Sequence, residues 1–234
     1  IRVDYKNIEQ WVFPYEKNTI CVNRSKKNIS FVSEIINTFK PDLIHIWGVE
    51  KRWGIVVNNI KPSCKVLLEI QGFKGLCSKV LYGGLIFSDF IFNIGLADLR
   101  YPKMFIPIQK NEFRKWGKIE KEIIKNTLAI NTQSEWVREY IRTINKKAII
   151  YKTGIILRRE IIESSSWLEK RIDNNQLFTI ASEMPYKGVH ITLLSFAELK
   201  KKQKNLTLKI AGIKINEYYK NYSYVNYLYR LCKA

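Results

Sequence analysis

Short apolar segments alternate with helix-length amphipathic segments along almost the whole chain, and this alternation constrains the fold more than any other sequence feature. It is typical of parallel β-strands joined by helices, because a parallel connection needs a crossover of helical length. The expected strands lie at residues 19–23, 42–47, 65–70, 127–131, 148–151, 177–181 and 206–211. The expected helices lie at residues 28–39, 53–60, 110–125, 134–143, 188–202 and 216–231. We expect Ser134 to be the N-cap of the helix at residues 134–143. The predicted fold class is α/β with parallel sheets.

The alternation is lost between residues 71 and 109, where glycines interrupt an apolar, aromatic stretch that favours a helical hairpin or a loop. A polar stretch at residues 164–176 then separates two groups of strands. We expect a Rossmann-like domain over residues 1–163 and the start of a second one over residues 164–234. Two strands and two helices do not complete such a domain, so we expect the second domain to be truncated.

Composition and charge limit the possible partners. Of the 234 residues, 46% are apolar, enough for a folded core and too many for a disordered polycation. The net charge of +19 attracts anions, but it does not select among nucleic acid, acidic lipid and phosphorylated small molecules.

Cysteine and histidine usage argues against a metal site. The four cysteines form no CxxC pair and there are two histidines, so the usual spacing of zinc ligands is missing. We interpret this usage as that of a cytoplasmic protein. The longest apolar stretch, residues 83–97, is too short to span a bilayer and carries Asp89 and Asn93.

Three clusters follow expected strands, where parallel sheets bind their ligands. They are HIWGVE at residues 45–50, EIQGF at residues 69–73 and MPYKGVH at residues 184–190. The third places Lys187 at the start of a helix, where backbone amides and the helix dipole favour phosphate. Each cluster also has a structural interpretation, since a glycine after a strand is often only a turn. We expect His45 to be a core or strand-end residue and His190 to lie on the surface.

The P-loop, zincin, dinucleotide-binding and nucleophile-elbow motifs are all missing from the sequence. Taken in order, the clusters resemble the GT-B glycosyltransferases of family 4, which have two Rossmann-like domains facing a cleft. The similar segments are FKPDLIHIWGVE at residues 39–50, KVLLEIQG at residues 65–72, NTLAINTQSEW at residues 126–136, and residues 178–212 with their KG helix.

Three departures from the family pattern are visible. The family's first strand and glycine-rich loop would precede residue 19, and they are absent. Gln71 stands where many relatives carry a histidine, and Ala181 stands where relatives usually carry an arginine. The Glu-x7-Glu motif would lie beyond Ala234, so we expect the chain alone to turn over sugar nucleotide poorly.

The resemblance implies a retaining hexosyltransferase of bacterial surface-polysaccharide assembly. It would move a hexose from a nucleotide diphosphate sugar to an oligosaccharide or lipid-linked acceptor, without a metal or further cofactor. By this resemblance, the catalytic residues are Glu50 and Gln71, the donor-binding residues are Lys187 and Gly188, and the acceptor-side residues are Trp47, Gly48 and Gly72.

Two alternatives stay open. One is a catalytically inactive glycosyltransferase fragment. The other is a basic nucleic-acid-binding protein, whose bases would stack on the tyrosines between residues 218 and 229, although no RNA- or DNA-binding signature occurs. We also expect peripheral contact of residues 83–97, which include Phe87, Phe90 and Phe92, with an anionic membrane.

Overall fold

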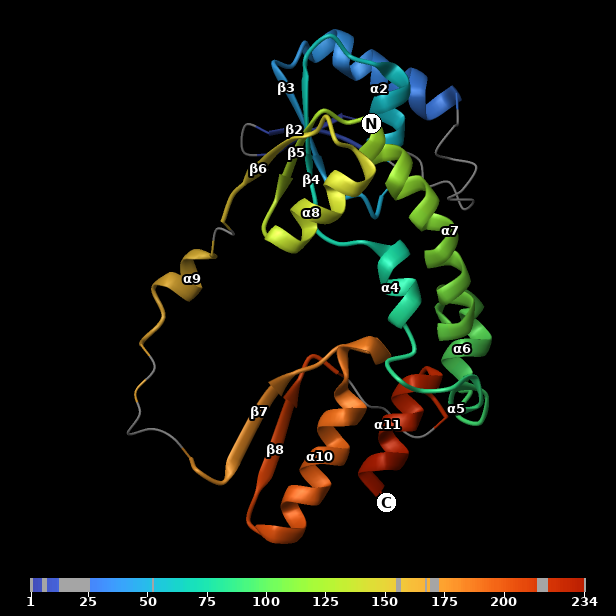
Figure 1. The fold of residues 1–234 in the computed structure, drawn as a ribbon, viewed down its shortest axis with the longest axis vertical. Helices are drawn as coiled ribbons and strands as arrows, with labels where there is room; N and C mark the ends of the chain where they lie inside the picture. Colours follow the sequence, from blue (N-terminus) through green and yellow to red (C-terminus); the bar gives the residue numbers. More distant parts are fainter. Residues whose placement is uncertain are drawn as a thin grey trace. The chain divides into compact units, whose positions relative to one another are not determined.

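The computed structural model describes residues 2–5, 8–12, 26–51, 53–154, 157–166, 168, 173–213 and 219–233 (Figure 1). The chain divides into two compact units. The first unit consists of Ile1–Gly72 and Ile119–Gly154, and the second of Phe73–Lys118 and Ile155–Ala234. The strand expected at residues 19–23 lies outside the described residues.

The first unit contains a parallel sheet, which confirms the predicted α/β class. Its described strands pair in the order β3-β4-β5-β6. They are β3 (Leu43–Trp47), β4 (Lys65–Glu69), β5 (Ala129–Thr132) and β6 (Ile149–Lys152). Each strand lies within two residues of its predicted position, because a short apolar run between polar turns is a local signal.

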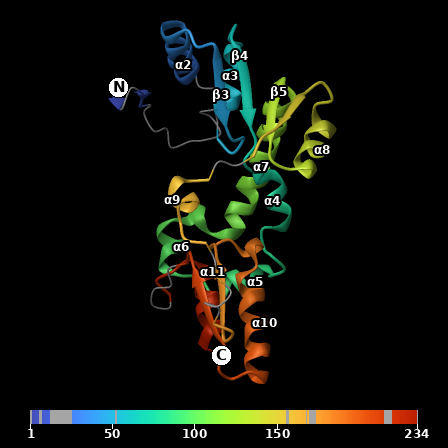
Figure 2. The ribbon, with the colours of Figure 1, turned by 90° about the vertical axis from the view of Figure 1, so that its left-hand side faces the viewer.

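Helices join these strands along the chain. They are α2 (Lys26–Phe39), α3 (Trp53–Ile60), α7 (Ile106–Lys125) and α8 (Glu135–Ile144), and α7 belongs to this unit from Ile119 onward. Figure 2 shows β3 and β4 side by side, with α8 near β5. An antiparallel hairpin of β1 (Arg2–Tyr5) and β2 (Ile8–Trp11) was not predicted.

One face of the sheet forms the core of the first unit. Ile46, Leu68 and Ile130 alternate inward from three neighbouring strands and are buried. Helix α3 lies close to α7, since a Cβ atom on Gly54 would be 2.5 Å from Cγ2 of Ile123. The opposite face carries large apolar side chains that stay about half exposed, namely Leu43, Trp47, Ile149 and Tyr151. In the part of the chain that the structure describes, this face of the sheet is therefore partly exposed, and we call it the open face.

The second unit combines two separate stretches of chain. The first stretch holds the short helices α4 (Lys74–Val80), α5 (Phe87–Ile91), α6 (Leu96–Arg100) and η1 (Pro102–Met104). The second holds α9 (Arg159–Ile162), β7 (Gln176–Ile180), η3 (Pro185–Lys187), α10 (Val189–Lys202), β8 (Thr207–Ala211) and α11 (Ser223–Lys233). Strands β7 and β8 form a parallel pair that is separate from the first sheet.

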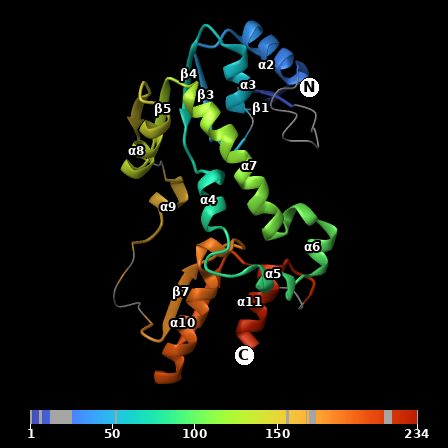
Figure 3. The same cartoon turned by 45° about the vertical axis from the view of Figure 1, so that its right-hand side comes forward.

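The core of the second unit joins these two stretches. Leu81, Phe90 and Ile106 pack in one cluster with Val189, Tyr224 and Leu228. Helix α11 lies against both α10 and α5 (Figure 3). Residues 73–118, which the expected boundary at residue 163 grouped with the first strands, pack with the C-terminal part instead. No described helix has the length and apolar character needed to cross a membrane.

Candidate functional site

The carboxyl ends of β3 and β4 bring two of the sequence clusters together. The strands pair with Trp47 opposite Glu69, and the Gly48 amide extends the ladder by donating to the Glu69 carbonyl at 2.9 Å. Because parallel strands end at the same edge of a sheet, Glu50 and Gln71 leave the sheet next to each other. We call this region, together with the residues that follow β5 and β6, the carboxyl edge.

The Glu50 carboxylate lies against both glycines of the carboxyl edge. A Cβ atom on Gly48 would overlap Glu50 Oε2, and one on Gly72 would lie 3.0 Å from Glu50 Oε1. Gly48 also has a φ of +82°, a conformation that favours glycine. The Gly48 Cβ position is 3.8 Å from Cγ of Gln71. The structure therefore places Gly48, Glu50, Gln71 and Gly72 in one small region.

Trp47 lies beside this group, on the open face of the sheet. Its side chain is exposed, and its ring contacts His45 edge-on with centroids 5.6 Å apart. An exposed indole offers a flat apolar surface and one N–H donor, which suits the apolar face and hydroxyls of a sugar.

The most strongly buried carboxylate of the carboxyl edge is Glu69, which is not among the predicted site residues. Its Oε1 accepts from Gln71 Nε2 at 3.3 Å and from Gln133 Nε2 at 3.4 Å, and its Oε2 accepts from Asn131 Nδ2 at 2.5 Å. His45 Nε2 lies 3.7 Å from Oε2. The sequence signal that could have pointed to Glu69 is a carboxylate inside the apolar run KVLLEI, since an acid in a buried strand needs hydrogen-bond partners.

Asn131 contributes an unused acceptor to the carboxyl edge. Its Nδ2 donates to Glu69 and also to Thr153 Oγ1 at 2.6 Å. Its Oδ1 is buried and has no hydrogen-bond partner among the described residues. A buried acceptor without a donor is costly, so this atom is suited to a ligand hydroxyl.

A groove of about 800 Å³ runs along the open face of the sheet and reaches Asn131 and Thr153. Its walls are mainly apolar, and they include Leu43, Leu67, Ala129, Ile149 and Tyr151. From the carboxyl edge, Asn131 and Thr153 thus contribute polar atoms to this mainly apolar groove, an arrangement typical of small-molecule sites.

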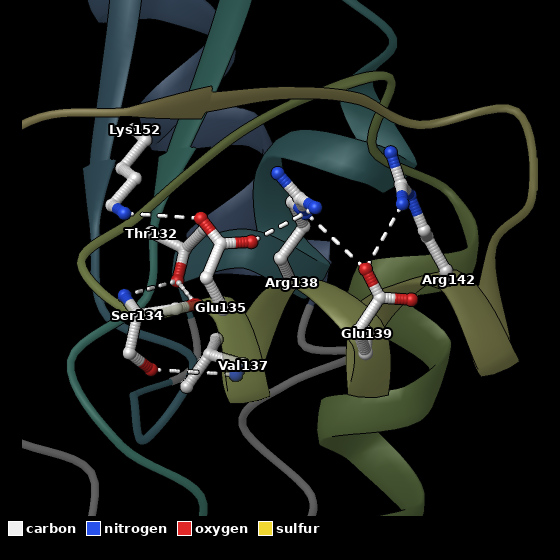
Figure 4. Close-up of polar contacts among 8 residues, drawn as sticks. All are labelled: Thr132, Ser134, Glu135, Val137, Arg138, Glu139, Arg142 and Lys152. Atoms are coloured by element: carbon white, nitrogen blue, oxygen red, sulfur yellow. Dashed lines mark hydrogen bonds and ion pairs between the residues drawn. The ribbon is translucent and has the colours of Figure 1, made fainter.

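The start of α8 is closed by protein side chains (Figure 4). Ser134 Oγ accepts from the Val137 amide at 3.3 Å, which confirms the predicted N-cap. The Glu135 carboxylate pairs with Lys152 at 3.0 Å and with Arg138 at 2.9 Å. The hydrogen bond from Lys152 is the main cause that lowers the pKa of Glu135. An anionic side chain already lies beside this helix start, so it is not suited to an anionic ligand.

In the second unit, the predicted donor-binding residues follow β7. Lys187 ends η3, and its exposed side chain places Nζ 5.2 Å from the Tyr186 ring centroid. The Gly188 amide donates to the Pro185 carbonyl at 2.9 Å, so it is engaged within the turn. Of the two predicted donor-binding residues, Lys187 therefore has the group that can meet a phosphate.

His190 is buried, so the expectation of a surface position was wrong. Its Nε2 donates to the Gly83 carbonyl at 3.0 Å, and its Nδ1 lies 2.9 Å from the Tyr224 hydroxyl. The backbone amide of His190 also donates to that hydroxyl, at 3.4 Å. Burial raises the pKa of Tyr224 to about 12, which keeps the phenol protonated as a donor to Nδ1. The polar groups of His190, in the first turn of α10, are thus bonded within the fold.

The tyrosines near the C-terminus do not form an exposed stacking surface in the described residues. Tyr224 is buried, Tyr222, Tyr227 and Tyr229 are half-buried, and Tyr219 is exposed. Tyr218 lies outside the described residues. No group of three or more potential metal-ligating side chains comes together in the part of the chain that the structure describes.

Comparisons with known proteins assign no family to this chain. No model of a protein family matches the sequence, and no curated protein matches it either.

Proposed function

We propose that this chain acts in retaining glycosyl transfer, moving a hexose from a nucleotide diphosphate sugar to an oligosaccharide or lipid-linked acceptor in surface-polysaccharide assembly. The observation that carries the proposal is the grouping of Glu50, Gln71 and two glycines at the carboxyl edge of a parallel sheet. The sequence resemblance to the GT-B family assigns those residues to the acceptor side.

The reaction needs a positioned acceptor hydroxyl and a neutralised diphosphate, and both are tasks of placement and electrostatics. In the first unit, the Glu50 carboxylate would accept a hydrogen bond from an acceptor hydroxyl. The Gln71 amide is oriented by its bond to Glu69, so it would hold a second sugar oxygen. Because Gly48 and Gly72 have no Cβ atoms, they leave room for the Glu50 carboxylate.

In the second unit, Lys187 would contribute a full positive charge to the diphosphate. Lys187 follows a parallel strand and precedes α10, so it lies where α/β sheets bind phosphates. The hydrogen bond from Gly188 to Pro185 removes one amide from this task. We therefore expect weak binding that depends mainly on the lysine.

Calorimetry with UDP and with GDP tests this assignment. We expect weak binding of at least one nucleotide by the parent chain and no measurable binding by the Lys187→Ala variant. Lys202→Ala is the matched control, because it removes the same charge from the exposed far end of α10. Equal binding by Lys187→Ala and the parent, or no binding of either nucleotide by the parent, would contradict the proposal.

A further inference from the structure

The segment from Ile86 to Leu99 in the second unit turns its apolar side chains outward. Phe92 is 75% exposed and Leu99 is 67% exposed, while Phe90 is buried. The exposed apolar residues are Ile86, Phe87, Ile91, Phe92, Ile94, Leu96 and Leu99, and we call them the apolar patch. Soluble monomers seldom expose so many large apolar side chains in one short segment, so the patch indicates an interaction surface.

The polar residues of the same segment are turned inward, toward α11. The Asn93 carbonyl accepts from Asn226 Nδ2 at 3.0 Å, and Asp98 Oδ2 accepts from the Ser223 amide at 2.6 Å. Both Asn93 and Asp98 are buried. Rotating the segment to bury its apolar side chains would break these bonds, so the fold itself holds the apolar patch toward solvent.

A close backbone contact fixes the orientation of the segment further. A Cβ atom on Gly95 would overlap the Asn221 carbonyl and would lie 2.5 Å from Asn226 Nδ2. The Leu96 amide donates to the Tyr219 carbonyl at 2.6 Å. The backbone between α5 and α6 is therefore held against the residues that lead into α11.

Positive charge accompanies the apolar patch. Arg100 and Lys103 follow it directly in the sequence, and both are exposed. The two acidic residues of the segment are engaged locally, because Asp89 accepts from the Ile86 amide at 2.8 Å and Asp98 is buried. The surface is thus apolar and aromatic with a basic border, a combination that favours the interface of an anionic bilayer.

We propose that the apolar patch docks on the surface of an anionic lipid bilayer, with its phenylalanines in the interface and Arg100 and Lys103 against the headgroups. Charge decides between this partner and a second copy of the chain. Two copies would bring the same basic border and two net charges of +19 together, whereas an anionic leaflet neutralises them. The proposal does not rest on glycosyl transfer.

Cosedimentation of the full chain with vesicles tests the proposal. We expect binding to vesicles of phosphatidylcholine mixed with phosphatidylglycerol, little binding to phosphatidylcholine alone, and release by high salt. The variant Phe87→Ser/Phe92→Ser should bind about tenfold more weakly, because two side chains leave the interface. Arg100→Gln/Lys103→Gln should weaken binding to the anionic vesicles selectively.

Ile161→Ser/Ile162→Ser is the matched control, since both side chains are exposed in the same unit but lie outside the apolar patch. It should bind like the parent, and all variants should melt at the parent's temperature because only exposed side chains change. Undiminished binding by Phe87→Ser/Phe92→Ser would overturn the proposal. So would a lipid-independent dimer that this variant dissociates, detected by analytical ultracentrifugation. Nucleotide is absent from the assay, so failure here leaves the transferase proposal untouched.

Discussion

The carboxyl ends of the two sheets differ in how their polar groups are hydrogen-bonded. At the carboxyl edge of the first unit, Glu50, Glu69 and Gln71 gather, and a buried Asn131 oxygen is left without a partner among the described residues. After β7 in the second unit, His190 and the start of α10 bind the Tyr224 hydroxyl instead. The first edge thus has a hydrogen-bond acceptor that the described residues leave without a donor. At the second edge, the polar groups of His190 and Tyr224 are bonded within the fold.

Replacing Glu69 should have the largest effect. Glu69→Leu removes a buried carboxylate that accepts from Asn131, Gln71 and Gln133, so it should lower the free energy of unfolding by about 3 kcal/mol. Glu69→Gln keeps the shape and one oxygen acceptor, and it should cost less. Urea denaturation of both variants measures the difference. Equal stability of Glu69→Leu and the parent would show that the buried network contributes nothing.

Tyr224→Phe tests whether the second edge is structural. The change leaves Nδ1 and the backbone amide of His190 without the hydroxyl and should cost about 2 kcal/mol. Hydrogen exchange should speed up at amides of α10 and α11. Tyr219→Phe, at an exposed position, is the control and should have little effect. If amide exchange in α10 and α11 is the same in both variants, the contact between Tyr224 and His190 does not stabilise the fold.

Gly48→Ala should cost about 1 kcal/mol, because alanine is disfavoured at positive φ. It should also displace Glu50, whose carboxylate occupies the space of the new methyl group. Gly84→Ala is the matched control, with a φ of +94° and no atom within 4 Å of its Cβ position. We expect similar losses of stability, while only Gly48→Ala shifts the Glu50 carboxyl resonance in an NMR spectrum. An unmoved resonance would contradict the described packing.

The smallest expected effect is a dependence of stability on pH. Burial raises the pKa of Asp98 above its ordinary 3.8, and this outweighs the hydrogen bonds from Gly95 and Ser223, which lower it. The folded chain therefore keeps this proton to higher pH than the unfolded chain. The free energy of unfolding contributed by Asp98 falls as pH rises from the ordinary value through the raised one.

Asp98→Asn should remove this contribution to the slope of the free energy of unfolding against pH, measured by denaturation across the same pH window. A slope that survives Asp98→Asn, or one that steepens in the opposite direction, would assign the pH dependence to other groups.

Local signals predicted most of the elements, and distant contacts explain what was missed. The strand at Lys65–Glu69 and the N-cap at Ser134 depend on neighbouring residues, so the sequence was sufficient for them. The burial of His190 depends on Tyr224 and Gly83, which are far away in the chain. The packing of residues 73–118 with the C-terminal part is equally nonlocal.

The candidate site divides in the same way. Glu50 and Gln71 were predicted because each follows an apolar strand, and parallel pairing then brings them together. Glu69 and Asn131 were missed as partners, because they lie on different strands and their hydrogen bond depends on the register between those strands. No property of either segment alone encodes that register.

The most direct test of these two site assignments is an NMR map of backbone amide shifts during separate titrations with UDP and with GDP. We predict shifts centred on Lys187 and Gly188 in the second unit and unchanged amides at Gly48 and Gly72 in the first. Shifts centred on Gly48 and Gly72, or a spectrum that neither saturating UDP nor saturating GDP changes, would contradict the assignment of the diphosphate to Lys187 and of the carboxyl edge to the acceptor.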